Sequence, residues 1–128
     1  DNHHGTSAAL EFAVTGLGVS HIMVLGHARC GGIEASLAGA EEGSFIGHWM
    51  AILDETRQGI DASASEAAQQ VGLELAGIGQ SMRNLLTFPF VAERVDAGSL
   101  SLHGGYFDIA TGVLNLRDPE SGSFSEVI

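Results

Sequence analysis

The side chains best suited to chemistry in this sequence are an imidazole and a thiol separated by two residues, His27 and Cys30. A histidine and a cysteine at this spacing can reach one metal ion across a tight turn. Neutral imidazole and thiolate are both standard zinc donors. The spacing alone more often belongs to a packed histidine near a buried thiol, so the surrounding sequence must be considered.

An apolar run at residues 19–26 directly precedes the pair and ends in glycine. A short continuous run of this kind predicts a β-strand buried on both faces, as in parallel sheets. Residues 28–32 are predicted to form a tight loop, and residues 33–37 to open a helix. Open α/β sheets bind ligands at the carboxyl ends of their strands, which is where this loop begins.

The start of the predicted helix favours the same chemistry. Its dipole favours negative charge and so helps to hold Cys30 as the thiolate. Gly31 and Gly32 expose backbone N–H groups to an anion bound beside a metal. From the residues alone, a zinc site and a packed histidine next to a buried thiol both remain open interpretations.

The bulk composition limits the classes of partner. The 128 residues suit a single domain, with 45% hydrophobic and 16% charged residues. The chain has sixteen acidic residues and five basic residues, the five all arginine, which gives a net charge of -11. Binding to duplex nucleic acid or to an anionic membrane requires a basic surface, so we expect neither partner.

The chain contains one cysteine, Cys30, which rules out an intramolecular disulfide framework. It shows no secretory signal and no apolar run of about 18 residues that would span a membrane. A reducing, cytoplasmic location is therefore expected.

The remaining pattern predicts an α/β domain. Thr6 or Ser7 is expected to cap a first helix, and residues 118–128 are expected to form a mobile polar end. Because strands alternate with helices, we predict a mainly parallel β-sheet flanked by helices, with a C-terminal β-hairpin. The other predicted elements are helices at residues 45–57 and 66–86, the second with the apolar stripe Val71, Leu75, Ile78, Met82 and Leu85, a stop or new helix at Pro89, and hairpin strands at residues 100–109 and 113–116.

Three stretches together resemble the β-class carbonic anhydrases. The first is GTSAALEFAVTGLGVSHIMVLGHARCGGIEASL at residues 5–37, with the strand that leads into Gly-His-x-x-Cys-Gly-Gly. The others are QSMRNLLTFPFV at residues 80–91 and LHGGYFDIATGVL at residues 102–114, which resemble the long helix, short helix and terminal hairpin of that family. The resemblance implies one carbonic-anhydrase-like domain over residues 1–128.

The resemblance implies a zinc ion bound by two cysteines and one histidine. His27 and Cys30 fall on the histidine and the second cysteine. The first cysteine of the family belongs to a Cys-x-Asp-x-Arg motif on an earlier strand, and this sequence has no such motif. The aspartate and arginine are missing with it, so no catalytic residue beyond the zinc ligands is implied. We therefore expect an N-terminally truncated portion of a longer enzyme.

Two further residues are assigned by the resemblance. The backbone N–H that follows the second cysteine faces the bound anion in the family, and this position is Gly31. An aromatic residue in the helix before the strand lines the substrate pocket, often from the neighbouring subunit, and Phe12 matches it. A homodimer or larger homo-oligomer is implied as well.

The implied activity is zinc-dependent, reversible hydration of carbon dioxide to bicarbonate in the intact parent. With two of three protein ligands, this chain is expected to bind zinc weakly or not at all and to be inactive as given. Two alternatives stay open: a metal-free relative that serves as a binding or assembly module, and a zinc hydrolase of carbonyl sulfide.

Overall fold

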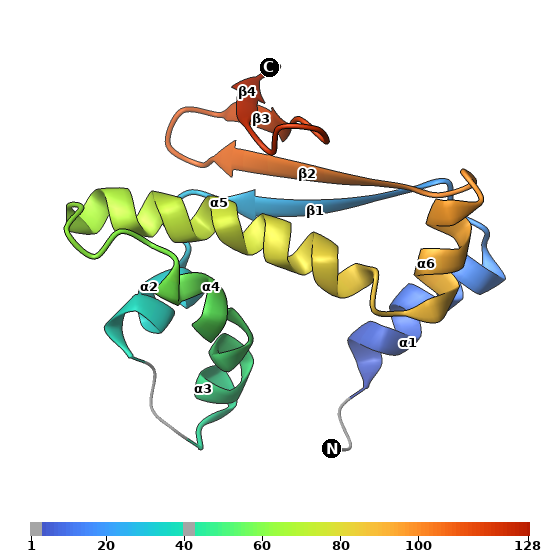
Figure 1. The fold of residues 1–128 in the computed structure, drawn as a ribbon, viewed down its shortest axis with the longest axis horizontal. Helices are drawn as coiled ribbons and strands as arrows, with labels where there is room; N and C mark the ends of the chain where they lie inside the picture. Colours follow the sequence, from blue (N-terminus) through green and yellow to red (C-terminus); the bar gives the residue numbers. More distant parts are fainter. Residues whose placement is uncertain (1–3, 40–42) are drawn as a thin grey trace.

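The computed structural model describes residues 4–39 and 43–128, and shows an α/β fold (Figure 1). In the described part of the chain one strand, β1, lies among the helices up to residue 96, and the other three strands follow them. The elements are α1 (Gly5–Glu11), the π-helical turn η1 (Phe12–Gly16), β1 (His21–His27), α2 (Gly31–Ala38), α3 (Phe45–Met50), the 3-10 turn η2 (Ala51–Leu53), α4 (Asp54–Gln58), α5 (Glu66–Leu85), α6 (Pro89–Asp96), β2 (Ser101–Asp108), β3 (Val113–Arg117) and β4 (Phe124–Glu126).

The four strands form one mixed sheet in the order β1-β2-β3-β4. Only β1 and β2 are parallel, in a register that runs from His21 opposite Ser101 to His27 opposite Phe107. The prediction of a mainly parallel sheet is wrong, because short turns join β2 to β3 and β3 to β4 and force both pairs to be antiparallel. The predicted C-terminal hairpin is confirmed as β2 and β3.

The predicted mobile end is also corrected. Within residues 118–128, β4 pairs with β3, and the Phe124 ring meets the Tyr106 ring edge-on. The turn that makes this possible begins at Asp118, whose carboxylate accepts hydrogen bonds from the backbone of Glu120 and Ser121. The polar residues of this stretch therefore form a turn, and a short strand follows it.

The first strand is covered on one face only. Helix α5 runs alongside β1 in Figure 1, and Ile78 of α5 contacts Gly26. Residues that alternate with these point the other way, and Met23 and Leu25 are 49% and 58% exposed. The prediction of a strand buried on both faces is therefore wrong, because no helix among the described residues covers the second face. β1 also ends the strand order, so its outer edge pairs with no described strand.

The long helix predicted at residues 66–86 is confirmed as α5, which begins after Ser65, whose side chain accepts a hydrogen bond from the Ala68 N–H. Its buried face shares only Ile78 with the predicted stripe: Val71 is exposed, and the other buried residues are Leu73, Glu74, Gly77 and Gly79. Within the described part of the chain, no helix has the length and apolarity needed to cross a membrane.

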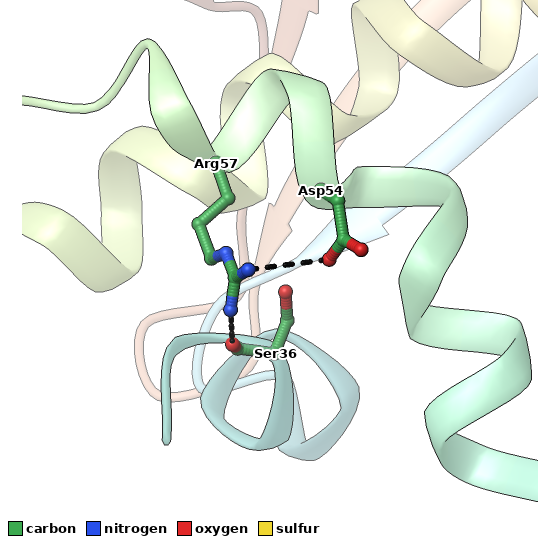
Figure 2. Close-up of polar contacts among 3 residues, drawn as sticks. All are labelled: Ser36, Asp54 and Arg57. Atoms are coloured by element: carbon green, nitrogen blue, oxygen red, sulfur yellow. Dashed lines mark hydrogen bonds and ion pairs between the residues drawn. The ribbon is translucent and has the colours of Figure 1, made fainter. Parts of the chain in front are cut away.

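The predicted helix at residues 45–57 is divided into α3, η2 and α4. This division brings Arg57 to the last turns of α2, where its guanidinium donates to the Ser36 carbonyl at 2.8 Å and pairs with Asp54 at 3.3 Å (Figure 2). A cation near the carbonyl end of a helix interacts favourably with the helix dipole. Arg57 thus joins α4 to α2.

The first and last helices share a separate core. Val14, Val91 and Leu100 are fully or almost fully buried there, between η1, α6 and the start of β2. Helix α6 begins at Pro89, as one of the two predicted possibilities allowed. The predicted cap of the first helix is wrong: α1 starts at Gly5, and its N-cap is His4, which makes no side-chain cap.

We predict that Gly26→Ala lowers the free energy of unfolding by about 1–3 kcal/mol, the usual cost of overpacking. A Cβ atom at Gly26 would lie 2.6 Å from Ile78 Cδ1, so the Ile78 side chain, which packs between α5 and β1, would have to shift. Denaturant unfolding of Gly26→Ala measures the loss. Gly5→Ala is the matched control, since its Cβ would meet nothing within 4 Å. Equal stability of the two variants would contradict the prediction.

Candidate metal centre

His27 and Cys30 line one cavity of about 310 Å³ where β1 ends and α2 begins. Side chains from β1, α2, η2 and α5 form most of its wall, and they are mainly apolar. The glycines at 26, 32 and 77 leave room for it. The lining residues are Val24, Leu25, Gly26, His27, Cys30, Gly32, Ile33, Trp49, Met50, Ile52, Leu53, Glu74, Gly77, Ile78, Ser81 and Asn84.

The His27 ring is arranged as a metal-binding imidazole usually is. Its Nδ1 lies 2.9 Å from the Ala28 carbonyl oxygen. A carbonyl can only accept, so Nδ1 carries the proton in this bond and Nε2 keeps its lone pair. Metal-ligating histidines commonly donate their other ring N–H to a backbone carbonyl in this way. Nε2 is therefore the nitrogen of His27 suited to bind a metal.

Cys30 is the N-cap of α2 and is half-buried. Its backbone is extended, and its side chain makes no capping hydrogen bond to the helix. Between the two candidate donors, Arg29 has a left-handed backbone with φ of 57°. This tight turn reverses the chain between strand and helix, so that both side chains reach the wall of one cavity.

A buried carboxylate behind the loop was missed at the sequence level. Glu74 of α5 is 4% exposed, and its Oε2 accepts hydrogen bonds from the Cys30 N–H at 2.8 Å and from Gln70 Nε2 at 2.9 Å. Its Oε1 accepts from the Tyr106 hydroxyl of β2 at 2.7 Å. Gln70 Nε2 also donates to the Cys30 carbonyl at 3.0 Å. We call Glu74, Gln70, Tyr106 and the Cys30 backbone the Glu74 network.

One sequence signal could have revealed Glu74. It lies four residues before Ile78, so it shares a helix face with an apolar residue that was predicted to be buried. A carboxylate on such a face must find donors when the helix packs. Its partners, however, lie 44 and 32 residues away in sequence, so their identity follows only from the fold.

The comparisons with known proteins agree with the geometry. The family profile described as "Carbonic anhydrase" matches residues 1–114. Beta carbonic anhydrase 5, chloroplastic, of Arabidopsis thaliana is 43% identical to this chain over 109 residues. The chain belongs to the β-class carbonic anhydrase family. The resemblance inferred from the GHARCGG loop and its flanks is thereby confirmed.

The coverage of these relatives is unequal. The Arabidopsis protein named above aligns with 80% of this chain, which spans 36% of that protein. Beta carbonic anhydrase 3 of the same plant is 32% identical over 122 residues, with 89% of this chain and 47% of the relative covered. The chain therefore spans less than half the length of these two curated relatives.

Solved structures of the family share the fold. The β-carbonic anhydrase CcaA has a TM-score of 0.80 at 24% identity, with 95% of this chain and 57% of that chain covered. A tetrameric β-carbonic anhydrase of Sordaria macrospora has a TM-score of 0.77 at 24% identity, with 97% and 63% covered. At these identities the likeness concerns the fold alone.

The two other residues assigned from the β-carbonic anhydrase pattern lie elsewhere. Gly31 is the exposed first residue of α2, next to Cys30, and is not part of the cavity wall. Phe12 is 62% exposed in η1, with its ring close to Gly16, and it does not line the cavity of its own chain. A role for Phe12 in the pocket of a neighbouring subunit stays a prediction.

The candidate donors of this β-carbonic anhydrase chain are of the types that bind zinc, but there are two of them. An imidazole with a free Nε2 and a thiol that caps nothing share one cavity. Catalytic zinc sites use three protein ligands and leave one position open. Within residues 4–39 and 43–128, no group of three His, Cys, Asp or Glu side chains is placed to hold a metal.

We predict that the one tyrosine of the chain ionises only well above its ordinary pKa. Burial, the hydrogen bond to Glu74 and the Glu74 charge all raise the pKa of Tyr106. The stability gained is complete below the ordinary value of about 10 and is lost as the pH rises towards the folded-state value. Tyrosinate absorbance of the folded and the urea-denatured chain measures the two titrations.

The same measurement has a built-in control. The chain has no lysine, so few other groups titrate in this window. The denaturant midpoint of unfolding should decrease as the pH rises from about 9 to about 11 in the wild type. In Tyr106→Phe it should decrease much less. Titration of the folded protein at the denatured value would refute burial of this hydroxyl.

Proposed function

We propose that the intact protein catalyses the zinc-dependent, reversible hydration of carbon dioxide to bicarbonate. The observation that carries the proposal is the pair of zinc-type donors on the wall of one mainly apolar cavity, in a chain that belongs to the β-class carbonic anhydrases. His27 Nε2 and the Cys30 thiolate are two of the donors. The third comes from outside these 128 residues, since Cys30 is their only cysteine.

The chemistry divides between the metal and this chain. A bound zinc ion activates water for attack on a carbonyl-type carbon at neutral pH. The hydrogen bond from His27 Nδ1 to the Ala28 carbonyl orients the ring and leaves Nε2 as the atom that would bind the metal. The backbone N–H of Gly31, at the start of α2, is available to the bicarbonate anion.

The cavity itself suits a small apolar substrate. Val24, Ile33 and Ile78 give it an apolar wall beside the donors, while Ser81 and Asn84 add polar groups to the same wall. Carbon dioxide has no net dipole and is held by such a surface through dispersion contacts. Bicarbonate is charged and is poorly accommodated there, which favours its release.

The open edge of β1 supports an external third donor. His27 ends β1, and the outer edge of this strand pairs with no described strand. Unpaired strand edges readily accept another strand, and a residue on such a strand would lie beside His27. An added strand would therefore both complete the sheet and bring a ligand to the metal.

We predict that the intact protein binds one zinc per site and that His27→Ala and Cys30→Ala lower both zinc content and carbon dioxide hydration by at least about 100-fold. Loss of one of three ligands leaves a weak, poorly shaped site. Elemental analysis measures the metal, and stopped-flow hydration measures the activity. His21→Ala on the same strand is the control, because His21 instead contacts His103, with 3.0 Å between ring nitrogens.

The outcomes separate the possible functions. An intact protein that holds no zinc and does not hydrate carbon dioxide contradicts the proposal and favours the metal-free binding relative. Zinc binding with hydrolysis of carbonyl sulfide, and no hydration, would favour the sulfur substrate. The 128-residue chain alone, with two donors, is expected to bind zinc weakly and to show no hydration above background.

We also propose that the protein is a homo-oligomer. Large apolar side chains are exposed next to one another along α3 and η2, namely Ile46, Trp49 and Ile52. Trp49 and Ile52 also line the cavity. Contiguous apolar surface beside a site is typical of protein interfaces. The Sordaria macrospora relatives are described as tetrameric, which agrees with this proposal.

Ile52→Glu is expected to weaken this association at least about tenfold, because it places a charge in an apolar interface. Sedimentation measures the assembly, and emission of Trp49, the single tryptophan, shifts to the blue as the interface forms. Ile109→Glu is the matched control, since Ile52 and Ile109 are each 55% exposed and Ile109 lies in the turn after β2. Equal effects of both changes would count against an interface at α3.

A further inference from the structure

We propose that Glu74 is a positioning residue for the metal centre: it holds the Cys30 backbone so that the thiol stays on the cavity wall beside His27. The inference rests on the proposed function, because Cys30 acts as a metal donor only under that function. The Glu74 carboxylate and the Cys30 amide nitrogen are 2.8 Å apart, and this contact is made by protein groups alone.

The first argument is that Cys30 cannot fix itself. An N-cap residue usually bonds its side chain to the backbone of the first helical turn, and so settles its own orientation. Cys30 is the N-cap of α2 without such a bond. This leaves the thiol available as a ligand, but it also removes the local contact that would orient the residue.

The second argument is that the network holds both backbone groups of Cys30. Its N–H donates to Glu74, and its carbonyl accepts from Gln70 Nε2 at 3.0 Å in addition to the Glu34 N–H of α2. Two side chains one turn apart on α5 therefore fix the peptide groups on either side of the Cys30 Cα. With both groups held, the direction of the Cα–Cβ bond is set.

The third argument comes from the turn between the donors. Arg29 has a φ of 57°, which costs a non-glycine residue energy and persists only where neighbours hold it. Before it, the Ala28 N–H donates to the Phe107 carbonyl at 2.9 Å. After it, the Cys30 N–H donates to Glu74. Without the second contact the turn can relax, and Cys30 can move away from His27.

The fourth argument is that Glu74 is itself held rigidly. It is buried, and Tyr106 from β2 and Gln70 from α5 occupy its two oxygens together with Cys30. All three partners are donors, so the group acts only as an acceptor, as a carboxylate does. Through Tyr106 of β2, the network ties the position of Cys30 to the same sheet that carries His27.

The test begins with readouts that need no metal. Cys30 is the only cysteine, so the alkylation rate of the chain reports its thiol alone, and amide exchange reports its N–H. In Glu74→Ala, exchange of the Cys30 amide should accelerate about ten- to hundred-fold, as expected for loss of a hydrogen bond to a charged group. Alkylation should accelerate as the thiol leaves the cavity wall.

Two further variants separate positioning from general weakening. Glu74→Gln keeps an oxygen for Cys30 and can turn its amide N–H towards the Tyr106 hydroxyl, so it should restore most of the Cys30 amide protection. Val91→Ala weakens the separate core of Val14, Val91 and Leu100 without touching the network, so it should leave Cys30 protection, relative to other amides, unchanged. If Glu74→Ala does not fold, Cys30 amide exchange in Tyr106→Phe and Glu74→Gln still tests the positioning role.

The metal readout is made on the intact protein with cobalt as the probe. Removal of a group that orients a metal ligand typically lowers metal affinity about 10- to 100-fold, and the thiolate-to-cobalt absorption band should weaken in Glu74→Ala and recover in Glu74→Gln. An intact protein that binds no metal defeats the proposed function and leaves the amide result standing. Unchanged Cys30 exchange and alkylation in Glu74→Ala, or equal changes in Val91→Ala, overturn the positioning role.

Discussion

The buried carboxylate of Glu74 is the contact on which the arrangement of this domain depends. Leaving a buried polar group without partners costs about 1–3 kcal/mol, and more when it is charged. Glu74 avoids this cost only when α5, β2 and the loop after β1 all reach their positions, since each supplies one donor. A single side chain thus links the sheet, its covering helix and the loop that carries the candidate donors.

Helix α2 shows the consequence most clearly. Its first residues follow Cys30, which the Glu74 network holds, and its later turns receive the Arg57 guanidinium at the Ser36 carbonyl (Figure 2). Both ends of this eight-residue helix are therefore fixed by other elements. A helix this short has little stability of its own, so tertiary contacts determine its place. Gly32 and Ile33 of this helix line the cavity, so those contacts also fix part of the cavity wall.

The sequence predicts the local parts of this arrangement and misses the distant ones. A strand at residues 19–26, a loop at residues 28–32 and a helix at residues 66–86 follow from period and from turn residues, and the structure has all three with small shifts at their ends. Strand direction and the one-sided burial of β1 depend on which elements meet, as do the partners of Glu74. The division of residues 45–57 into three segments, which brings Arg57 to α2, is likewise absent from the apolar pattern. No periodic pattern contains this information.

Three features of β1 have one explanation under the proposed function. Among the residues that the structure describes, nothing pairs with its outer edge, its Met23 and Leu25 side chains face solvent, and the site at its end has two donors where a catalytic zinc needs three. A neighbouring strand would pair with the edge and could supply the third donor, while further chain or a second subunit could cover the exposed apolar face. The apolar side chains of β1, its unpaired backbone groups and the open ligand position of the metal would then all find their partners on the same side of the sheet. The Glu74 network takes its groups from α5 and β2, so it can hold Cys30 in place before that neighbour arrives.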